Sequence, residues 1–389
     1  MEETYYEMDL PRENIHLRCF AHSIMNYRYH WHPDEYELSI VLKGNQEYCR
    51  GTETHSLFED DLILTAPGNG HASIEGGDQM GKVAFVFSGQ GAQYSGMGKS
   101  LYEHSAAAKN VFDTAESIRP GTKNQCFSGT LEEISITKNT QPCLFCVDLA
   151  AAEALREAGI TPDVTAGFSL GEVAAVTFAG IFTTEEGFSL VTKRGEAMQA
   201  AAEQADSAMA AVLKLPNEKV EELCRMHQSV FPVNYNCPGQ LVVAGLKTTL
   251  PDFLSDVAAN GGRAVPLNVS GGFHSPFMES ASARLHDVLE TMDVKEPTVP
   301  VYANYTAEPY TKETAKELLT QQVAHPVRWQ QTVEKMIEAG VDTFVEVGAG
   351  KTLCGLIKKT SRAVKVYNVE DAETLSAAVQ AIRAEGENA

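Results

Sequence analysis

The chain has 389 residues, of which 43% are hydrophobic and 21% charged, values typical of a folded protein with room for two or three domains. Its 52 acidic against 31 basic side chains give a formal net charge of −21, which argues against nonspecific binding to nucleic acid or to an anionic membrane surface. Eight scattered cysteines and the lack of a secretion signal predict reduced thiols in a cytoplasmic protein. No apolar run reaches the roughly 20 residues of a membrane-spanning helix.

The composition changes near Met80, and this change predicts two unrelated parts. Residues 1–79 carry 5 basic against 15 acidic side chains, whereas residues 80–389 carry 26 against 37 over almost four times the length. The first part also holds 6 of the 11 histidines. Residues 75–78 read Glu-Gly-Gly-Asp, which is typical of a linker. We therefore predict a domain boundary between residues 79 and 80.

The first part is predicted to be β-structure, with strands over residues 36–42 and 62–64. His30 and His32 are two positions apart, so on a strand their side chains point the same way. With Glu37 and His71 they form a set that is able to ligate a divalent metal. The alternatives are a metal-free ligand pocket or polar packing, and we favour the prediction that no metal is bound.

The spacing of these residues resembles a known family. His30-x-His32-x4-Glu37-x6-Gly44, followed by His71, is similar to the first and second motifs of a small cupin barrel. It is most similar to the N-terminal sensor domain of AraC-type transcription regulators. Only about the first half of such a barrel is present, and no helix-turn-helix pattern follows. The resemblance therefore implies a partial cupin-like segment, and a ligand-sensing regulator is one functional alternative for it.

From residue 80 onward, predicted strands alternate with predicted helices. Such alternation indicates an α/β fold whose mostly parallel sheet has helices on both faces, with ligands at the carboxyl ends of the strands. Two glycine-rich segments and the serine discussed below fall at those ends. The predicted strands are 83–87, 164–166 and 343–347, and the predicted helices are 101–115, 141–158 and 172–178.

The order of the predicted elements changes between about residues 206 and 269. Here the predicted order is strand 209–215, helix 217–227, strand 230–236, strand 240–244, helix 249–260 and strand 263–269. This βαββαβ order is that of a ferredoxin-like unit. We expect it to be a small subdomain inserted into the larger one, where it acts as a lid that helps to exclude water.

Gly167-Phe168-Ser169-Leu170-Gly171 reads as a nucleophile elbow. A serine between two glycines, after a strand and before a helix, is typical of a sharp turn that exposes the hydroxyl above the sheet. The amino end of the following helix favours negative charge on a bound carbonyl oxygen. A chance occurrence in a loop is the alternative to this interpretation, because the pentapeptide alone is not specific.

Further motifs appear in an order that makes the elbow specific. They are 87–93 (Phe-Ser-Gly-Gln-Gly-Ala-Gln), 193–195 (Lys-Arg-Gly), 273–275 (Phe-His-Ser), 321–329 and 346–350 (Glu-Val-Gly-Ala-Gly). In order and approximate spacing they resemble the malonyl-CoA:acyl carrier protein transacylase family, across essentially all of residues 80–389. The resemblance implies an α/β-hydrolase-like large subdomain with an inserted ferredoxin-like small subdomain.

The resemblance also implies a catalytic arrangement. Ser169 corresponds to the nucleophile and His274 to the base that takes its proton. The backbone carbonyl of Gln322, rather than a carboxylate, corresponds to the group that orients the imidazole. The backbone N–H groups of Gln90 and Leu170 correspond to the donors that stabilise the oxyanion.

Arg194 is the residue that the resemblance links to substrate choice. A guanidinium grips a carboxylate with two hydrogen bonds, so it favours a malonyl group over an uncharged acyl group. Leu170 and Phe273 resemble the malonyl-selecting forms of their motifs, and Asn236 matches a segment at the substrate pocket.

These expectations define an acyltransferase that moves a malonyl group from malonyl-CoA to the phosphopantetheine thiol of acyl carrier protein. The predicted route is a malonyl-serine intermediate in fatty-acid or polyketide chain elongation, without a bound cofactor or metal. A serine thioesterase or esterase is the closest alternative. Arg194 and the lack of a triad acid argue against that alternative.

Overall fold

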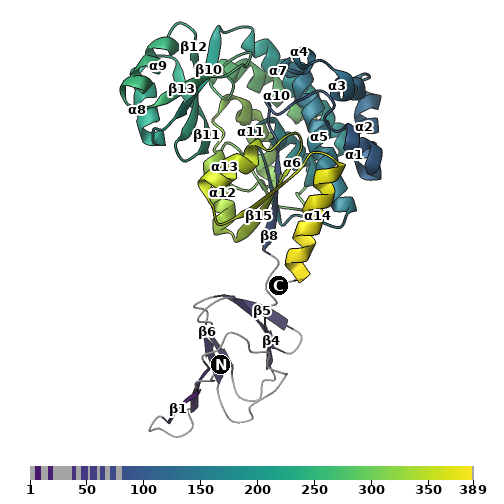
Figure 1. The fold of residues 1–389 in the computed structure, drawn as a ribbon, viewed down its shortest axis with the longest axis vertical. Coiled ribbons are helices and arrows are strands. Elements are labelled where there is room, and N and C mark those ends of the chain that lie inside the picture. Colours follow the sequence, from purple (N-terminus) through teal and green to yellow (C-terminus); the bar gives the residue numbers. More distant parts are fainter. Residues whose placement is uncertain are drawn as a thin grey trace. The chain divides into compact units, whose positions relative to one another are not determined.

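A computed structural model of the chain defines seven strands within residues 5–75 and then residues 81–387 without interruption. The chain divides into two compact units, one that holds the seven strands and one that spans Gly81–Ala384 (Figure 1). Among the helices of these described residues, none has both the length and the apolar character needed to cross a membrane.

The strands of the N-terminal unit pair antiparallel. The predicted strands at 36–42 and 62–64 are confirmed as β3 (Glu37–Ile40) and β6 (Leu62–Thr65), which pair with each other. The other pairings join β1 (Tyr5–Asp9) to β2 (His16–Phe20), and β4 (Asn45–Arg50) to both β5 (Glu53–Phe58) and β7 (His71–Glu75).

The candidate metal ligands of this unit are not tested by the structure. His30 and His32 lie outside the described residues, as do the side chains of Glu37 and His71. The choice between a metal site, a metal-free pocket and polar packing therefore stays a prediction.

The larger unit is built on a parallel sheet with the strand order β14-β9-β8-β15-β16, as the alternating pattern predicts. The chain enters in the middle at β8, adds β9 and β14 on one side, and returns to add β15 and β16 on the other. This reversal between β8 and β15 is a topological switch point, where α/β sheets open a crevice at their carboxyl ends. The strands are β8 (Lys82–Phe87), β9 (Val164–Gly167), β14 (Val301–Tyr302), β15 (Val341–Val347) and β16 (Lys365–Val369).

Helices cover both faces of this sheet (Figure 1). Along β8, Phe85 and Phe87 join one core, whereas Ala84 and Val86 join a second core, because successive side chains of a strand point to opposite faces. The second core lies against α12 (Trp329–Glu338) and α13 (Thr352–Thr360). The remaining helices are α1 (Lys99–His104), α2 (Ala106–Ile118), α3 (Thr122–Ser128), α4 (Leu131–Ile134), α5 (Thr137–Glu157), α6 (Leu170–Phe178), α7 (Thr184–Ala202), α10 (Glu279–Glu290), α11 (Lys312–Gln321) and α14 (Ala372–Glu387), with 3-10 turns η1 (Pro276–Met278) and η2 (Gln322–Ala324).

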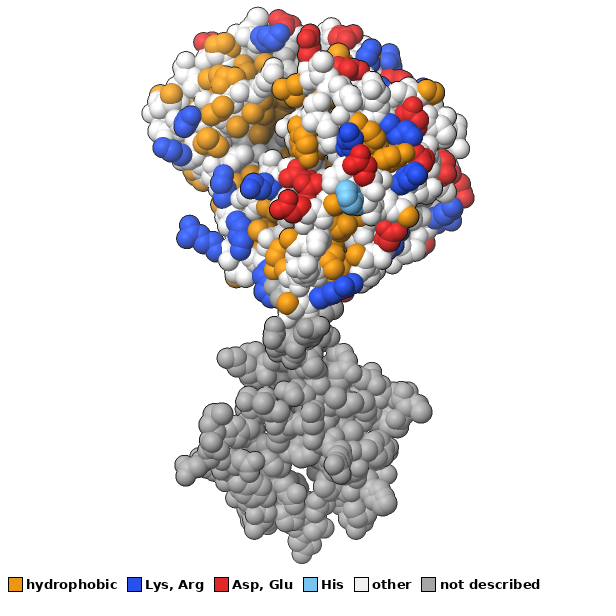
Figure 2. Space-filling view, turned by 45° about the vertical axis from the view of Figure 1, so that its right-hand side comes forward, with side chains coloured by type: hydrophobic (Ala, Val, Ile, Leu, Met, Phe, Trp, Pro, Cys, Tyr) orange, Lys and Arg blue, Asp and Glu red, His pale blue; other side chains and the backbone are white. Residues whose placement is uncertain are grey.

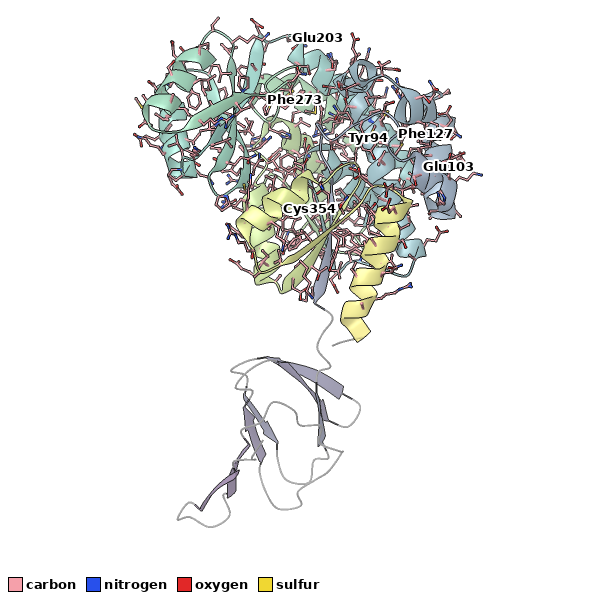
Figure 3. The ribbon with its side chains drawn as sticks, in the orientation of Figure 1. Tyr94, Glu103, Phe127, Glu203, Phe273 and Cys354 are labelled. Atoms are coloured by element: carbon pink, nitrogen blue, oxygen red, sulfur yellow. The ribbon has the colours of Figure 1, made fainter. Side chains whose placement is uncertain are left out.

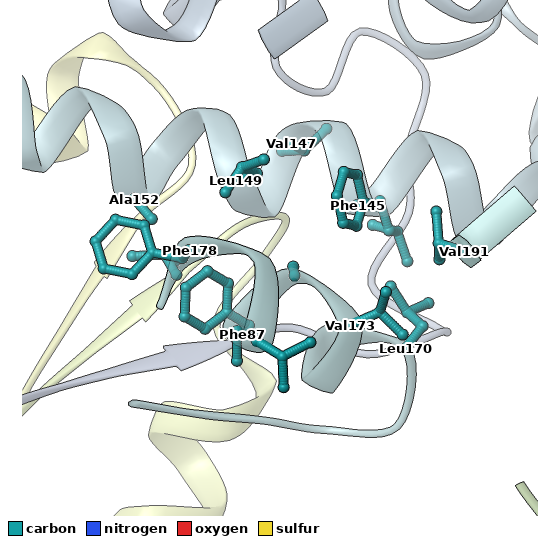
Figure 4. Close-up of a cluster of buried hydrophobic side chains, with 14 of the residues drawn as sticks. Phe87, Phe145, Val147, Leu149, Ala152, Leu170, Val173, Phe178 and Val191 are labelled. Carbon is teal, nitrogen blue, oxygen red and sulfur yellow. The ribbon is translucent and has the colours of Figure 1, made fainter. Parts of the chain in front are cut away.

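The first core fixes the helix that follows the elbow. Figure 4 shows Leu170 and Val173 of α6 facing side chains of α5, with Phe87 and Phe178 nearby. All nine residues of α6 are buried, so the helix has little freedom to shift against the sheet. The apolar run after the serine therefore anchors the helix amino end beneath the reactive hydroxyl.

One predicted helix is wrong in detail. Residues 101–115 form two helices instead of one, with a break at Ser105. The Ser105 hydroxyl accepts a hydrogen bond from the Ala108 N–H at 3.0 Å, so this serine starts α2 as its N-cap.

The inserted segment forms its own four-stranded antiparallel sheet, with the order β11-β12-β10-β13. Val212, Val243 and Phe253 belong to a third core, between this sheet and its two helices. The elements follow the predicted order, and their ends differ by up to three residues. They are β10 (Ser207–Leu213), α8 (Asn217–Met226), β11 (Val230–Cys237), β12 (Gln240–Leu246), α9 (Leu250–Ala259) and β13 (Arg263–Pro266).

Backbone hydrogen bonds tie this small subdomain to the large one. The Tyr235 N–H donates to the Val327 carbonyl at 2.9 Å, and the Val327 N–H donates to the Val233 carbonyl at 2.8 Å. Asn234 of β11 therefore forms an isolated parallel bridge with Val327, in the segment that precedes α12.

Candidate active site

Ser169 has the strained backbone that a nucleophile elbow requires. It lies between β9 and α6 with φ 57° and ψ −105°, a conformation that costs a residue with a side chain about 1–3 kcal/mol. The two flanking positions must be glycine because neither has room for a side chain. A Cβ on Gly167 would lie 2.0 Å from the carbonyl carbon of Gly171, and one on Gly171 would lie 2.4 Å from the Phe87 oxygen.

The structure brings Ser169, His274 and Gln322 together from three separate segments. The Ser169 Oγ lies 2.8 Å from His274 Nε2, and His274 Nδ1 lies 2.9 Å from the backbone oxygen of Gln322. A carbonyl oxygen only accepts, so Nδ1 carries the proton and donates it to Gln322. Nε2 is then the free base that accepts the hydrogen bond from the serine hydroxyl.

The surroundings keep this imidazole neutral. His274 is 3% exposed, and burial, followed by the nearby charge of Arg194, lowers the pKa of His274 to about 4. A neutral imidazole can take a proton, whereas an imidazolium cannot. At neutral pH the site therefore holds its base in the reactive form.

Arg194, on α7, is a buried cation beside the nucleophile. Its Nη2 donates to Ser169 Oγ at 3.2 Å and to Gln322 Oε1 at 2.8 Å, and its Nη1 donates to Gln141 Oε1 at 2.8 Å. Burial lowers the pKa of Arg194 to about 10, so the guanidinium stays charged at neutral pH. Within residues 81–387 it forms no ion pair, although a buried charge is costly unless it is paired.

Two backbone N–H groups are available for an oxyanion. Within residues 81–387, the N–H groups of Leu170 and Gln90 have no hydrogen-bond acceptor. Leu170 follows the nucleophile at the amino end of α6, and Gln90 follows β8 at the switch point. The Gln90 side chain donates to Thr137 Oγ1 at 3.3 Å, which holds this loop near the start of α5.

Phe273 and Asn236 are buried, but within residues 81–387 neither forms a hydrogen bond with Ser169 or Arg194. Phe273, labelled in Figure 3, is 6% exposed and precedes His274 in the segment of the chain between β13 and η1. Asn236, on β11, is 7% exposed, and its Oδ1 finds no hydrogen-bond partner in the described part of the chain. No hydrogen bond among those residues joins it to Ser169 or Arg194. Its substrate role stays a prediction.

Three amide side chains that the motifs do not predict also contribute to the site. Gln141 accepts from Arg194, and the Gln322 side chain accepts from Arg194 while it donates to the Ser169 carbonyl at 2.6 Å. Asn304 contacts the elbow directly, two positions after the end of the two-residue strand β14. Amides carry no charge or spacing signal, so the sequence does not mark these residues.

One face of the molecular surface is hollowed. Figure 2 shows a recess on one face of the described unit, with hydrophobic side chains around it and Lys and Arg side chains along the nearby edge. An apolar recess with a few convergent polar groups is typical of a small-molecule site.

The Cys143 and Cys146 thiols belong to the core. Both side chains are fully buried on α5, and burial raises the pKa of Cys146 well above its usual value. No cluster of potential metal ligands occurs among the described residues.

The fold and the site are those of an acyltransferase with a serine nucleophile. The model of the acyl transferase domain matches residues 84–386, and the chain belongs to this family. The model of the cupin domain matches residues 26–87.

Named relatives share one activity. The chain is 42% identical to the malonyl CoA-acyl carrier protein transacylase of Bacillus subtilis (strain 168), over 80% of this chain and the whole relative. The fold is similar to that of the malonyl CoA-acyl carrier protein transacylase from Clostridium perfringens, with a TM-score of 0.76 and 36% identity over 78% of this chain and 98% of that one. Another similar structure is a malonyl-transacylase in complex with a type II PKS acyl-carrier protein (TM-score 0.75, 33% identity, 77% of this chain and 99% of that one).

We predict that acylation of the enzyme remains fast in mild acid. Because the pKa of His274 is about 4, kcat/KM for malonyl-CoA should fall less than about two-fold between about pH 8 and about pH 5. A base with the ordinary histidine pKa of about 6.5 would lose about 30-fold over that range. Stopped-flow rates across the range measure this difference.

Arg194→Met serves as the comparison, because loss of the guanidinium charge raises the pKa of His274. For each chain the rate at about pH 5 is divided by the rate at about pH 8. This ratio should be lower for Arg194→Met than for the unaltered chain. A tenfold or larger decline in the unaltered chain would contradict the prediction.

Proposed function

We propose that this chain transfers the malonyl group of malonyl-CoA to the phosphopantetheine thiol of an acyl carrier protein, and so supplies malonyl units for chain elongation. The observation that carries the proposal is the charge of Arg194. Within residues 81–387 this buried guanidinium forms no ion pair, and it lies one hydrogen bond from the nucleophile, so it fits an acyl group that brings its own carboxylate. The named relatives support the same donor and acceptor.

The first half-reaction acylates the serine. Ser169 Oγ attacks the thioester carbonyl while its proton passes to His274 Nε2, 2.8 Å away. The N–H groups of Leu170 and Gln90 receive the oxyanion, and Arg194 holds the distant carboxylate. As the intermediate collapses, the carbon–sulfur bond breaks, and the imidazolium returns its proton to the CoA thiolate.

The second half-reaction runs the same steps in reverse with a new thiol. The phosphopantetheine thiol gives its proton to His274 and attacks the serine ester, and the Ser169 oxygen leaves and regains the proton. Each step is a proton transfer or a carbonyl addition. We therefore propose that the transfer needs no bound cofactor or metal.

The architecture fits this role. We interpret the parallel-sheet unit as α/β-hydrolase-like and the inserted unit, about residues 206–269, as a ferredoxin-like lid that limits the access of water to the serine ester. We infer that residues 1–79 are a partial cupin-like segment, similar to an AraC-type sensor, that takes no part in the transfer.

A covalent intermediate is the direct test of this function. Brief incubation with malonyl-CoA should leave one malonyl adduct on Ser169, and later addition of holo acyl carrier protein should move the adduct to that protein. Intact-protein and peptide mass spectrometry measures both events, with Ser169→Ala as the control that forms no adduct. Release of free malonate in place of malonyl-carrier would support a thioesterase instead.

Substrate choice should depend on Arg194. Arg194→Ala is expected to lower kcat/KM for malonyl-CoA by about 100-fold or more and to leave acetyl-CoA unaffected or improved, because only malonyl has the carboxylate. Arg194→Lys keeps a charge but not the two-point contact, so it should recover only part of the loss. Equal losses for both donors would contradict this assignment.

Removal of residues 1–79 should leave the transfer intact. The family model begins at residue 84, and Gly81–Ala384 is a compact unit of its own. We expect kcat and KM for both substrates within about two-fold of the full chain, as for a separate domain. A large loss of transfer in a truncated chain with an unchanged melting temperature would show that the segment contributes to the site.

A further inference from the structure

Asn304 contacts both sides of the elbow with a single side chain. Its Oδ1 accepts a hydrogen bond from the Ser169 N–H at 2.7 Å, and its Nδ2 donates to the Gly167 carbonyl at 2.5 Å. The residue is 1% exposed and lies two positions after the end of β14, the neighbour of the strand that leads into the elbow. The amide therefore bridges the two peptide groups between which the chain turns.

We propose that Asn304 is a positioning residue that holds the backbone of Ser169 in its strained conformation. Strained backbone persists only where surrounding contacts determine it. Here one contact fixes the N–H of the nucleophile itself, and the other fixes the last carbonyl of β9. The Ser169 N–H is thereby occupied, so Leu170 supplies the oxyanion donor at this turn.

A second layer of contacts holds Asn304 in place. Its backbone N–H donates to Glu172 Oε1 at 2.8 Å, and the Tyr310 hydroxyl donates to the same oxygen at 2.5 Å. Glu172 is fully buried on α6, one turn after the nucleophile. The Asn304 carbonyl accepts from the Arg328 N–H at 2.8 Å. The asparagine is thus fixed from α6, from the Tyr310 loop and from α12.

Within residues 81–387 the Asn304 amide makes no hydrogen bond to Arg194, although Glu172, which holds Asn304, also interacts with Gln322 and Arg194. Arg194 has its own hydrogen-bond partners, Gln141 and Gln322. Loss of the Asn304 amide should therefore affect the reactivity of the serine and leave the binding of the malonyl carboxylate unchanged. The inference rests on the proposed function, because the rate in question is acylation by malonyl-CoA.

The first test uses Asn304→Ala in the full chain. We expect its single-turnover acylation rate to fall about 100-fold, because small displacements of a reacting group cost about that much. The Kd for malonyl-CoA, measured in a Ser169→Ala background, should change less than about two-fold. Acylation within about three-fold of the unaltered chain, or a Kd that rises in parallel with the rate loss, would overturn the inference.

A second variant gives a signal that a purely structural role would not produce. In Asn304→Asp, a charged carboxylate accepts from Ser169 but cannot donate to the Gly167 carbonyl, whereas the protonated carboxyl does both. Acylation relative to the unaltered chain should therefore rise at least about five-fold as the pH is lowered from about 8 to about 6. The comparison is made as a ratio because Glu172, whose pKa burial raises to about 7, titrates in the same range, and because Tyr310, His274, Arg194 and Arg328 also surround the position. A ratio that does not change with pH would overturn the inference.

The third test compares two tyrosines. Tyr310→Phe removes the hydroxyl that holds Glu172, and we expect a three- to ten-fold lower acylation rate, roughly what one lost hydrogen bond in a positioning chain costs. Tyr302→Phe is the matched control, since its hydroxyl makes no hydrogen bond within residues 81–387, and its rate should not change. Equal rates in the two variants would count against the inference.

These outcomes are distinct from failure of the proposed function. If the unaltered chain forms no malonyl-serine, the function is wrong. If it does and Asn304→Ala forms malonyl-serine equally fast, only the positioning role is wrong.

Discussion

A single buried cation organises the chemistry of this molecule. The Arg194 guanidinium is surrounded by the neutral oxygens of Gln141, Gln322 and Ser169, and within residues 81–387 it forms no ion pair. Neutral oxygens satisfy its N–H groups, and the nearby carboxyl of Glu172 also acts on its charge. Under the proposed function, the carboxylate of the substrate supplies a direct ionic partner. The same charge helps to keep His274 neutral, so the group that we propose holds the substrate carboxylate also helps to keep the imidazole in its basic form.

Gln322 connects these two roles. Its backbone oxygen fixes the tautomer of His274, while its side-chain oxygen accepts from Arg194 and its side-chain nitrogen donates to the Ser169 carbonyl. One residue in a 3-10 turn thus determines the relative positions of base, cation and nucleophile. A neutral orienting group suits this site, because a carboxylate in its place would pair with Arg194 and compete with the substrate.

Much of this site was predictable because its key residues lie in ordered motifs. The elbow glycines, His274, Arg194 and the Gln322 carbonyl were all identified before the structure, and the strand–helix alternation predicted the parallel sheet. Asn304 and Gln141 were not, since a lone amide has no periodicity or charge to mark it. The break at Ser105 was missed because an apolar pattern continues through a capping serine, whose role depends on a local hydrogen bond.

The bridge between β11 and Val327 limits how the small subdomain can move. Two backbone hydrogen bonds, at 2.8 and 2.9 Å, make its sheet continuous with the segment before α12. A hinged swing of this sheet away from that segment would have to break both bonds. Under the proposed function, water is then kept from the serine ester without a swing of this sheet, and the flexible arm of each thioester supplies the reach to Ser169.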